Sequence, residues 1–181
     1  MKFIITLFAS LFITTTAFAQ QLFFSAPNIH GSWNVQGDAG DSILNPVCRM
    51  QTNWQDGSFF TLIKDLKDGE LYILMQVNTW NIIDPPGSIA TARFNFYSGN
   101  TISGGPATYE LLSKNTVRFR GLHSERFLPD FDRSSSLTIV MPNTIPNAFI
   151  NLTGTSDALQ AMSNCMRAFK SAPQNKPGIN L

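Results

Sequence analysis

Residues that commonly carry catalysis are few in this chain of 181 residues, which contains two histidines, His30 and His123. A hydrolase triad needs a nucleophile, a base and an orienting acid, and the sequence holds no Gly-x-Ser-x-Gly elbow or other local signature of one. Ser124 and Glu125 follow His123 directly, but neighbouring residues on an extended strand point to opposite faces. We therefore expect no catalytic residue, with His123 in an ordinary loop and His30 in an N-terminal arm.

Ligands for a metal ion are also scarce. A structural zinc site takes four Cys or His ligands, whereas the chain has two cysteines and two histidines. Asp38 with Asp41, or Asp130 with Asp132, offer carboxylates, but neither pair has the spacing of the helix–loop–helix calcium site. Both segments are more typical of polar turns, and nothing implies the apolar pocket that would separate the pKa values of Asp130 and Asp132 for acid–base catalysis. The sequence predicts no metal and no cofactor.

The N-terminus predicts that the protein is exported. Lys2 supplies a basic start, residues 3–13 form an apolar stretch, and residues 17–19 (Ala-Phe-Ala) form a small-x-small cleavage site. The apolar stretch is much shorter than the ~20 residues that cross a bilayer, which disfavours the alternative of a retained membrane anchor. We expect residues 1–19 to be removed as a signal peptide, leaving a periplasmic or secreted protein with no membrane span. In such an oxidising compartment Cys48 and Cys165 are expected to form a disulfide.

The charge balance argues against some classes of partner. The chain has 13 lysines and arginines against 12 acidic residues, and Lys2 leaves with the signal, so the mature net charge is near zero. General nucleic-acid binding needs a clustered basic excess that displaces counterions from phosphates. A composition that is 43% hydrophobic and 14% charged is typical of a globular protein. We expect a folded protein that does not bind nucleic acid.

Alternation of apolar and polar residues, which is the pattern of half-buried strands, runs through the middle of the chain. It is clearest in residues 70–78, 93–97, 116–120 and 137–141. Asp-Gly pairs at 56–57 and 68–69 lie between apolar segments, and Asp-Gly is a preferred pair for a tight hairpin turn. The pattern indicates a meander of short antiparallel strands.

One segment near the C-terminus has the pattern of a helix. Ser156 is a good N-cap, and apolar residues then recur at spacings of three and four, at Leu159, Met162, Met166 and Phe169. Cys165 lies beside this stripe, so a bridge to Cys48 would hold the helix against the sheet.

These patterns together predict the fold class and the organisation of the chain. The expected class is α+β, mostly antiparallel β as a curved sheet or small sandwich, with one C-terminal helix packed on it. We expect a flexible N-terminal arm over residues 20–30, a single β-rich domain over 31–171, and a flexible tail over 172–181.

The segment 79–87 is the best candidate for contact with a partner. It follows a strong strand and ends in two prolines that a central strand would not tolerate. Loops usually run over the surface, and Trp80, Ile82 and Ile83 would supply the apolar anchors that interfaces use. The alternative is that this loop folds back and caps the end of the core.

Arginines offer a second candidate surface. Alternation places Arg118 and Arg120 on one strand face, where Arg93 from another strand could join them. Three arginines on a sheet face could bind a carboxylate, a phosphate or an acidic partner. The alternative is a solvated face whose arginines pair with acidic residues such as Glu110 and Glu125.

Several features together resemble small exported proteins of Gram-negative bacteria. They are the cysteine that opens the first long strand, the strand at 136–141, and the segment Leu-Thr-Gly-Thr-Ser-Asp-Ala-Leu at 152–159 followed by Cys165. In outline, from Trp33 to Phe169, the chain is similar to the invasion-associated locus B type of periplasmic protein, although it lacks additional cysteines expected of a close relative. The resemblance implies an exported β-rich scaffold and no known enzymatic activity.

The function expected from the sequence is therefore binding. We expect a non-enzymatic exported module that binds an envelope component or a host protein. The alternative is a small periplasmic hydrolase or ligand-binding protein whose site no motif reveals.

Overall fold

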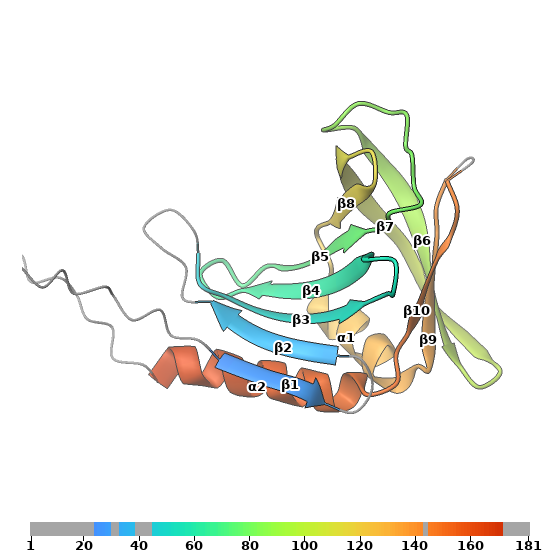
Figure 1. Ribbon diagram of the computed structural model, residues 1–181. Helices are drawn as coiled ribbons and strands as arrows, with labels where there is room; N and C mark the ends of the chain where they lie inside the picture. Colours follow the sequence, from blue (N-terminus) through green and yellow to red (C-terminus); the bar gives the residue numbers. More distant parts are fainter. Residues whose placement is uncertain (1–23, 30–32, 39–44, 143–144, 172–181) are drawn as a thin grey trace, which may run out of the picture.

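A single antiparallel sheet that curls into a half-barrel dominates the computed structural model (Figure 1). The structure describes residues 24–29, 33–38, 45–142 and 145–171; the expected signal peptide and C-terminal tail lie outside them. Within these ranges the sheet has ten strands in the order β1-β2-β3-β4-β5-β8-β7-β6-β9-β10. Its elements are β1 (Phe24–Ile29), β2 (Trp33–Asp38), β3 (Val47–Asn53), β4 (Phe59–Asp65), β5 (Leu71–Gln76), β6 (Ile89–Ser98), β7 (Thr101–Ser113), β8 (Thr116–Phe119), α1 (Ser124–Arg133), β9 (Ser136–Val140), β10 (Ala148–Asn151) and α2 (Thr155–Ser171).

The first five strands form the expected meander, and its turns lie where the sequence predicts them. The Asp-Gly pairs join β3 to β4 and β4 to β5, with positive φ at Gly57 (81°) and Gly69 (69°). The Asp65 carboxylate accepts hydrogen bonds from the backbone N–H groups of Lys67 (2.8 Å) and Asp68 (3.0 Å), which stabilises the second turn.

The remaining strands leave the simple meander order. The β6–β7 hairpin runs in register from Ile89 opposite Glu110 to Ser98 opposite Thr101. Strand β8 inserts between β5 and β7, and β9 pairs with the free side of β6. The described strands thus form one curled sheet with a common inner face (Figure 1).

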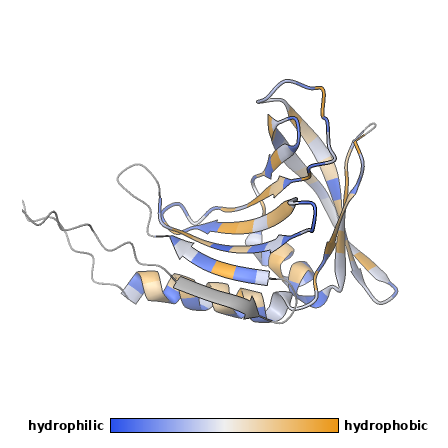
Figure 2. Ribbon diagram, in the orientation of Figure 1, coloured by the Kyte–Doolittle hydropathy of each residue, from blue (hydrophilic) through white to orange (hydrophobic). Residues whose placement is uncertain are grey.

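Alternate residues of the strands point to that inner face and make the core. Figure 2 shows hydrophobic residues along the central strands and on the helices. Trp33, Phe60 and Phe131 are fully buried and contact one another, with ring centroids 5.7 to 6.1 Å apart. Edge-to-face and offset aromatic pairs of this kind stabilise a core beyond the area that they bury.

The C-terminal helix α2 packs on β1, β2 and β3, as the sequence predicts for a helix held against the sheet. The disulfide joins Cys165 on α2 to Cys48 on β3, with their Cα atoms 6.1 Å apart. The helix begins at Thr155 rather than at the expected N-cap, Ser156. The buried hydroxyl of Thr155 donates to the carbonyl of Leu152 at 2.8 Å, and the helix begins two residues earlier than an N-cap at Ser156 predicts.

Two elements differ from the sequence-based expectation. Residues 24–29, expected in a flexible arm, form the edge strand β1. Residues 124–133, expected as loop and polar turn, form the helix α1, which contains Pro129 and buries only Phe127 and Phe131. A ten-residue helix with two buried positions lacks the long apolar stripe by which helices are recognised. Within the described part of the chain, no helix combines the length and hydrophobicity needed to cross a membrane.

Candidate functional site

The loop between β5 and β6 does not present Trp80 to solvent. Trp80 is 2% exposed and Ile82 is 6% exposed, whereas Ile83 is 93% exposed. Backbone hydrogen bonds attach the loop to the β7–β8 region: Ile82 N–H donates to Lys114 (2.8 Å) and Gly87 N–H donates to Leu111 (2.7 Å). The expectation of a surface anchor at Trp80 and Ile82 is wrong, and the loop caps the core, which was the alternative. Of the three anchor residues, Ile83 alone projects outward.

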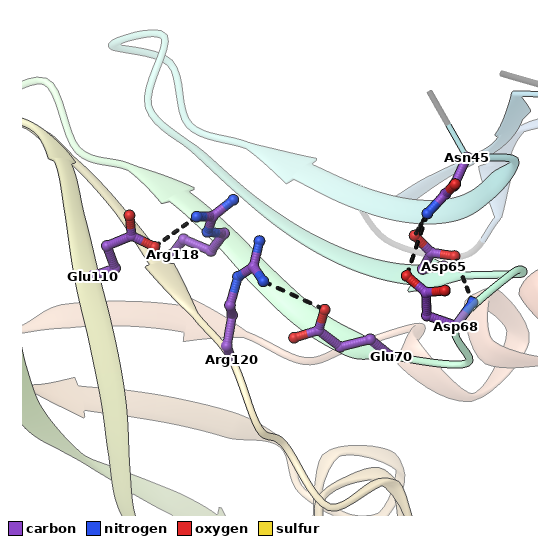
Figure 3. Close-up of polar contacts among 7 residues, drawn as sticks. All are labelled: Asn45, Asp65, Asp68, Glu70, Glu110, Arg118 and Arg120. Carbon is purple, nitrogen blue, oxygen red and sulfur yellow. Dashed lines mark hydrogen bonds and ion pairs between the residues drawn. The ribbon is translucent and has the colours of Figure 1, made fainter. Parts of the chain in front are cut away.

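The arginines of the second candidate surface pair with glutamates (Figure 3). Arg118 Nη2 lies 2.6 Å from Glu110 Oε2, and this hydrogen bond holds the pKa of the Glu110 carboxyl below its ordinary value. Arg120 Nη1 lies 3.7 Å from Glu70 Oε2. Arg93 lies two strands away from β8, on β6, and donates to Asn95. Arg118 therefore fits the alternative of a paired, solvated face, and Arg120 is only loosely paired.

A cavity of about 800 Å³ opens beside Arg120, between α1 and the β6–β7 hairpin. We call it the α1–β7 cleft. Three segments form its walls: β6 and β7, the turn that connects β8 to α1, and the first part of α1. The lining residues are Phe94, Phe96, Gly104, Gly105, Pro106, Ala107, Thr108, Arg120, Gly121, Leu122, His123, Arg126, Phe127 and Asp130.

The floor of the cleft is a cluster of phenylalanines. Phe94, Phe96 and Phe127 are each less than 10% exposed, and their ring centroids lie 5.5 to 6.4 Å apart. The contacts are edge-to-face, an arrangement that holds aromatic rings in place. The floor is therefore apolar, and its phenyl rings are themselves almost fully buried.

Small residues on β7 leave space above this floor. Gly105 lies opposite Phe94 in the β6–β7 ladder and shares the inner face with Ala107. A Cβ added to Gly105 would have no heavy atom within 4 Å, so it would enter open space. By contrast, a Cβ at the neighbouring Gly104, where φ is +114°, would lie 2.3 Å from the Phe94 carbonyl oxygen. The backbone conformation at position 104 thus requires a glycine, whereas the lack of a side chain at Gly105 leaves the cleft open.

Charged side chains stand at the rim. Arg126 is exposed on α1, and its guanidinium forms no ion pair with any described carboxylate. His123 Nδ1 lies 3.7 Å from Glu125 Oε1, with both side chains more than 70% exposed. Asp130 follows Arg126 by one helical turn. The rim therefore carries charges of both signs, and the Arg126 guanidinium is available there to a ligand.

The structure thus brings together one predicted binding residue, Arg120, and residues that the sequence did not single out. No sequence pattern identifies Arg126 and Phe127, because the sequence predicts a loop where α1 forms. Nor does any pattern identify Gly105, because a glycine carries no chemical signal. Asp130 lies at the rim and Asp132 lines a different, smaller hollow. In the described ranges, no group of three or more His, Cys, Asp or Glu residues is arranged to hold a metal ion.

The fold and the cleft define a curled antiparallel half-barrel, with helices on its inner face and an open amphipathic cavity. No protein-family model and no curated protein sequence matches the chain. Among solved structures the chain is similar to the crystal structure of invasion associated protein B from Bartonella henselae, with 13% sequence identity and a TM-score of 0.51. The match covers 80% of this chain and 99% of that chain. This likeness is one of fold alone, and it agrees with the resemblance noted in the sequence.

Proposed function

We propose that this protein is an exported, non-enzymatic binding protein that takes up an envelope component in the α1–β7 cleft. One observation carries the proposal: an open cavity of about 800 Å³ whose floor is apolar and whose rim holds Arg126 without an acidic partner. Ligand sites are typically cavities of this size, lined mainly by apolar side chains with a few charged groups that orient the ligand.

Export is supported by three independent features. The N-terminal sequence has the order of a signal peptide. The disulfide between β3 and α2 is typical of an oxidising compartment. The fold resembles that of a bacterial invasion associated protein.

The cleft, rather than the loop at Trp80, is the surface that we assign to binding. The Trp80 side chain is 2% exposed and has almost no area to offer a partner, whereas the cleft is an open cavity whose lining includes the exposed Arg126 and the half-buried Leu122. Arginine side chains at a concave site are frequent anchors of binding.

The experiment is to express the full chain in a Gram-negative bacterium, purify the exported protein, and identify co-purifying small molecules by mass spectrometry. The matched variant is Gly105→Leu, whose side chain enters the open space of the cleft. We expect molecules bound to the natural protein to be absent from Gly105→Leu. The same molecules on both proteins, or none on either, would contradict the proposal.

A hydrolase is the second candidate, because His123 lines the same cleft and its Nδ1 lies 3.7 Å from Glu125 Oε1. A triad would also need a nucleophile beside this pair, and among the described residues that line the cleft the one hydroxyl belongs to Thr108. Hydrolysis of chromogenic esters that is lost in His123→Ala, with ligand retention unchanged, would favour this candidate.

A further inference from the structure

A second cavity, of about 520 Å³, forms where the turn between β3 and β4 faces β10, the last strand in the order of the described sheet (Figure 1). We call it the β10 pocket, and it shares no lining residue with the α1–β7 cleft. We propose that the β10 pocket binds a neutral sugar, whose ring lies against aromatic side chains and whose hydroxyl groups bond to amides and a carboxylate. The side chains concerned are the aromatic Trp54 and Phe149, the amides Gln55 and Asn147, and the carboxylate Asp56.

Two aromatic side chains supply the apolar part of the pocket. Phe149 on β10 is 61% exposed, which makes it the most exposed aromatic group among the side chains that the structure describes. Trp54, directly after β3, is half-buried. An aromatic ring offers a flat apolar surface with a weakly negative face, and the C–H groups on one face of a pyranose ring suit such a surface. The exposed Phe149 ring therefore has area to offer a ligand.

The amides beside these rings have hydrogen-bonding groups that the protein does not use. Gln55 is exposed, and its side chain forms no hydrogen bond within the described chain. The side-chain carbonyl of Asn147 accepts from the N–H of Met141 at 3.1 Å, which leaves its NH₂ group free to donate. A sugar hydroxyl both donates and accepts, so it can bond to either amide.

Asp56 is the one charged side chain among the described residues that line the pocket. The N–H and the hydroxyl of Ser58 each donate to one of its oxygens at 2.9 Å, and these bonds hold the pKa of the Asp56 carboxyl below its ordinary value. Each oxygen keeps a lone pair for a sugar hydroxyl. Because the lining has a carboxylate and no cation, the pocket disfavours anionic ligands.

The turn that carries these groups is fixed by the end of β5. The side-chain amide of Asn78 donates to the carbonyl of Asp56 at 2.6 Å, and the N–H of Asn78 donates to the hydroxyl of Ser58 at 2.9 Å. The N–H of Trp54 donates to the carbonyl of Ser58 at 2.9 Å, which closes the turn. A site whose groups are already in place loses less conformational entropy when a ligand binds.

An organic cation is the main alternative ligand, because aromatic rings and a carboxylate also attract quaternary ammonium groups. Such a cation offers no hydrogen bond to Gln55 or Asn147, and it would displace water from amides that then lack a partner. A neutral sugar satisfies the rings, the amides and the carboxylate together. The amides therefore favour the sugar.

The test is NMR spectroscopy of the exported protein, titrated with the methyl glycosides of glucose, galactose, mannose and N-acetylglucosamine. Methyl glucuronide is the anionic analogue of methyl glucoside, and choline is the organic cation. We expect at least one neutral glycoside to bind and to shift the indole resonance of Trp54. We expect methyl glucuronide to bind about tenfold or more weakly than methyl glucoside, because its carboxylate meets Asp56, and choline not to bind.

Variants locate the ligand. Phe149→Ala is expected to weaken sugar binding by about tenfold or more, as for loss of an aromatic anchor. Gln55→Ala is expected to weaken it by about two- to tenfold, as for loss of one neutral hydrogen bond. The matched control is Ile102→Ala on β7, whose side chain is also 61% exposed, and it should change nothing. Gly105→Leu fills the α1–β7 cleft and should also leave sugar binding unchanged. Thermal unfolding verifies that each variant is folded.

Each contrary outcome is distinct. If none of the neutral glycosides binds, the proposal is overturned. Sugar binding that is unchanged in Phe149→Ala, or lost in Gly105→Leu, overturns its location in the β10 pocket. Binding of choline without binding of sugars overturns the ligand class, and equal affinity for methyl glucoside and methyl glucuronide overturns the role of Asp56. The α1–β7 cleft shares no lining residue with this pocket, so its proposed function is decided separately by the co-purification experiment.

Discussion

Gly105 lies directly opposite Phe94 in the β6–β7 ladder, and the space that a side chain at Gly105 would fill is the space of the α1–β7 cleft. Its neighbour Gly104 has a φ of +114°, and a Cβ added there would clash with the carbonyl oxygen of the same phenylalanine. Two adjacent glycines therefore have different physical roles, and each role can be tested.

The first prediction contrasts these two glycines. Gly105→Ala should leave stability unchanged or raise it by about 0.5 to 1 kcal/mol, because glycine weakens a strand and nothing obstructs the new Cβ. Gly104→Ala should lower stability by more than ~1 kcal/mol, because of the clash and the positive φ. Chemical denaturation of both variants measures the difference, and equal midpoints would contradict this account.

The second prediction concerns the loop that caps the core. Trp80→Ala should destabilise the protein by about 3 to 5 kcal/mol, since it removes a large buried side chain. Ile83→Ala is the matched control from the same loop, and its 93% exposure predicts a change within about 0.5 kcal/mol. Denaturation curves compare the two, and a small effect of Trp80→Ala would show that the loop is not part of the core.

The third prediction concerns the disulfide. Cys165→Ser should lower stability by about 2 to 5 kcal/mol, because the bridge joins residues that are 117 apart in sequence and constrains the unfolded chain. Chemical reduction of the natural protein should produce a similar loss, which serves as the control. A melting temperature that is unchanged by both treatments would mean that α2 packs equally well without the bridge.

The fourth prediction concerns pH. The hydrogen bond from Arg118 lowers the pKa of Glu110 below its ordinary value of 4.5. A carboxyl whose pKa is lower in the folded state stabilises that state above the unfolded pKa, and this contribution disappears as pH falls through the folded pKa. NMR titration should find the pKa of Glu110 below 4.5 in the natural protein and closer to 4.5 in Arg118→Met. An identical pKa in the two proteins would show that the ion pair does not form in solution.

The sequence by itself determined the features that depend on neighbouring residues. Alternation predicted the strands that became β5, β6, β8 and β9, and the Asp-Gly pairs predicted the turns at Gly57 and Gly69. The apolar stripe around Cys165 predicted α2 and its attachment to the sheet. Turn geometry and side-chain periodicity are properties of a few consecutive residues, so a single chain reveals them.

Only the tertiary structure decided the burial of Trp80, the helix α1 and the cleft. Trp80 is buried because its loop bonds to the distant residues Lys114 and Leu111. The cleft forms where β6, β7 and α1 meet beside Gly105, which has no side chain to fill the space. No local sequence pattern predicts such a cavity. Burial and cavities depend on which segments the curl of the sheet brings together. These contacts are long-range, so they exist only once the chain has folded.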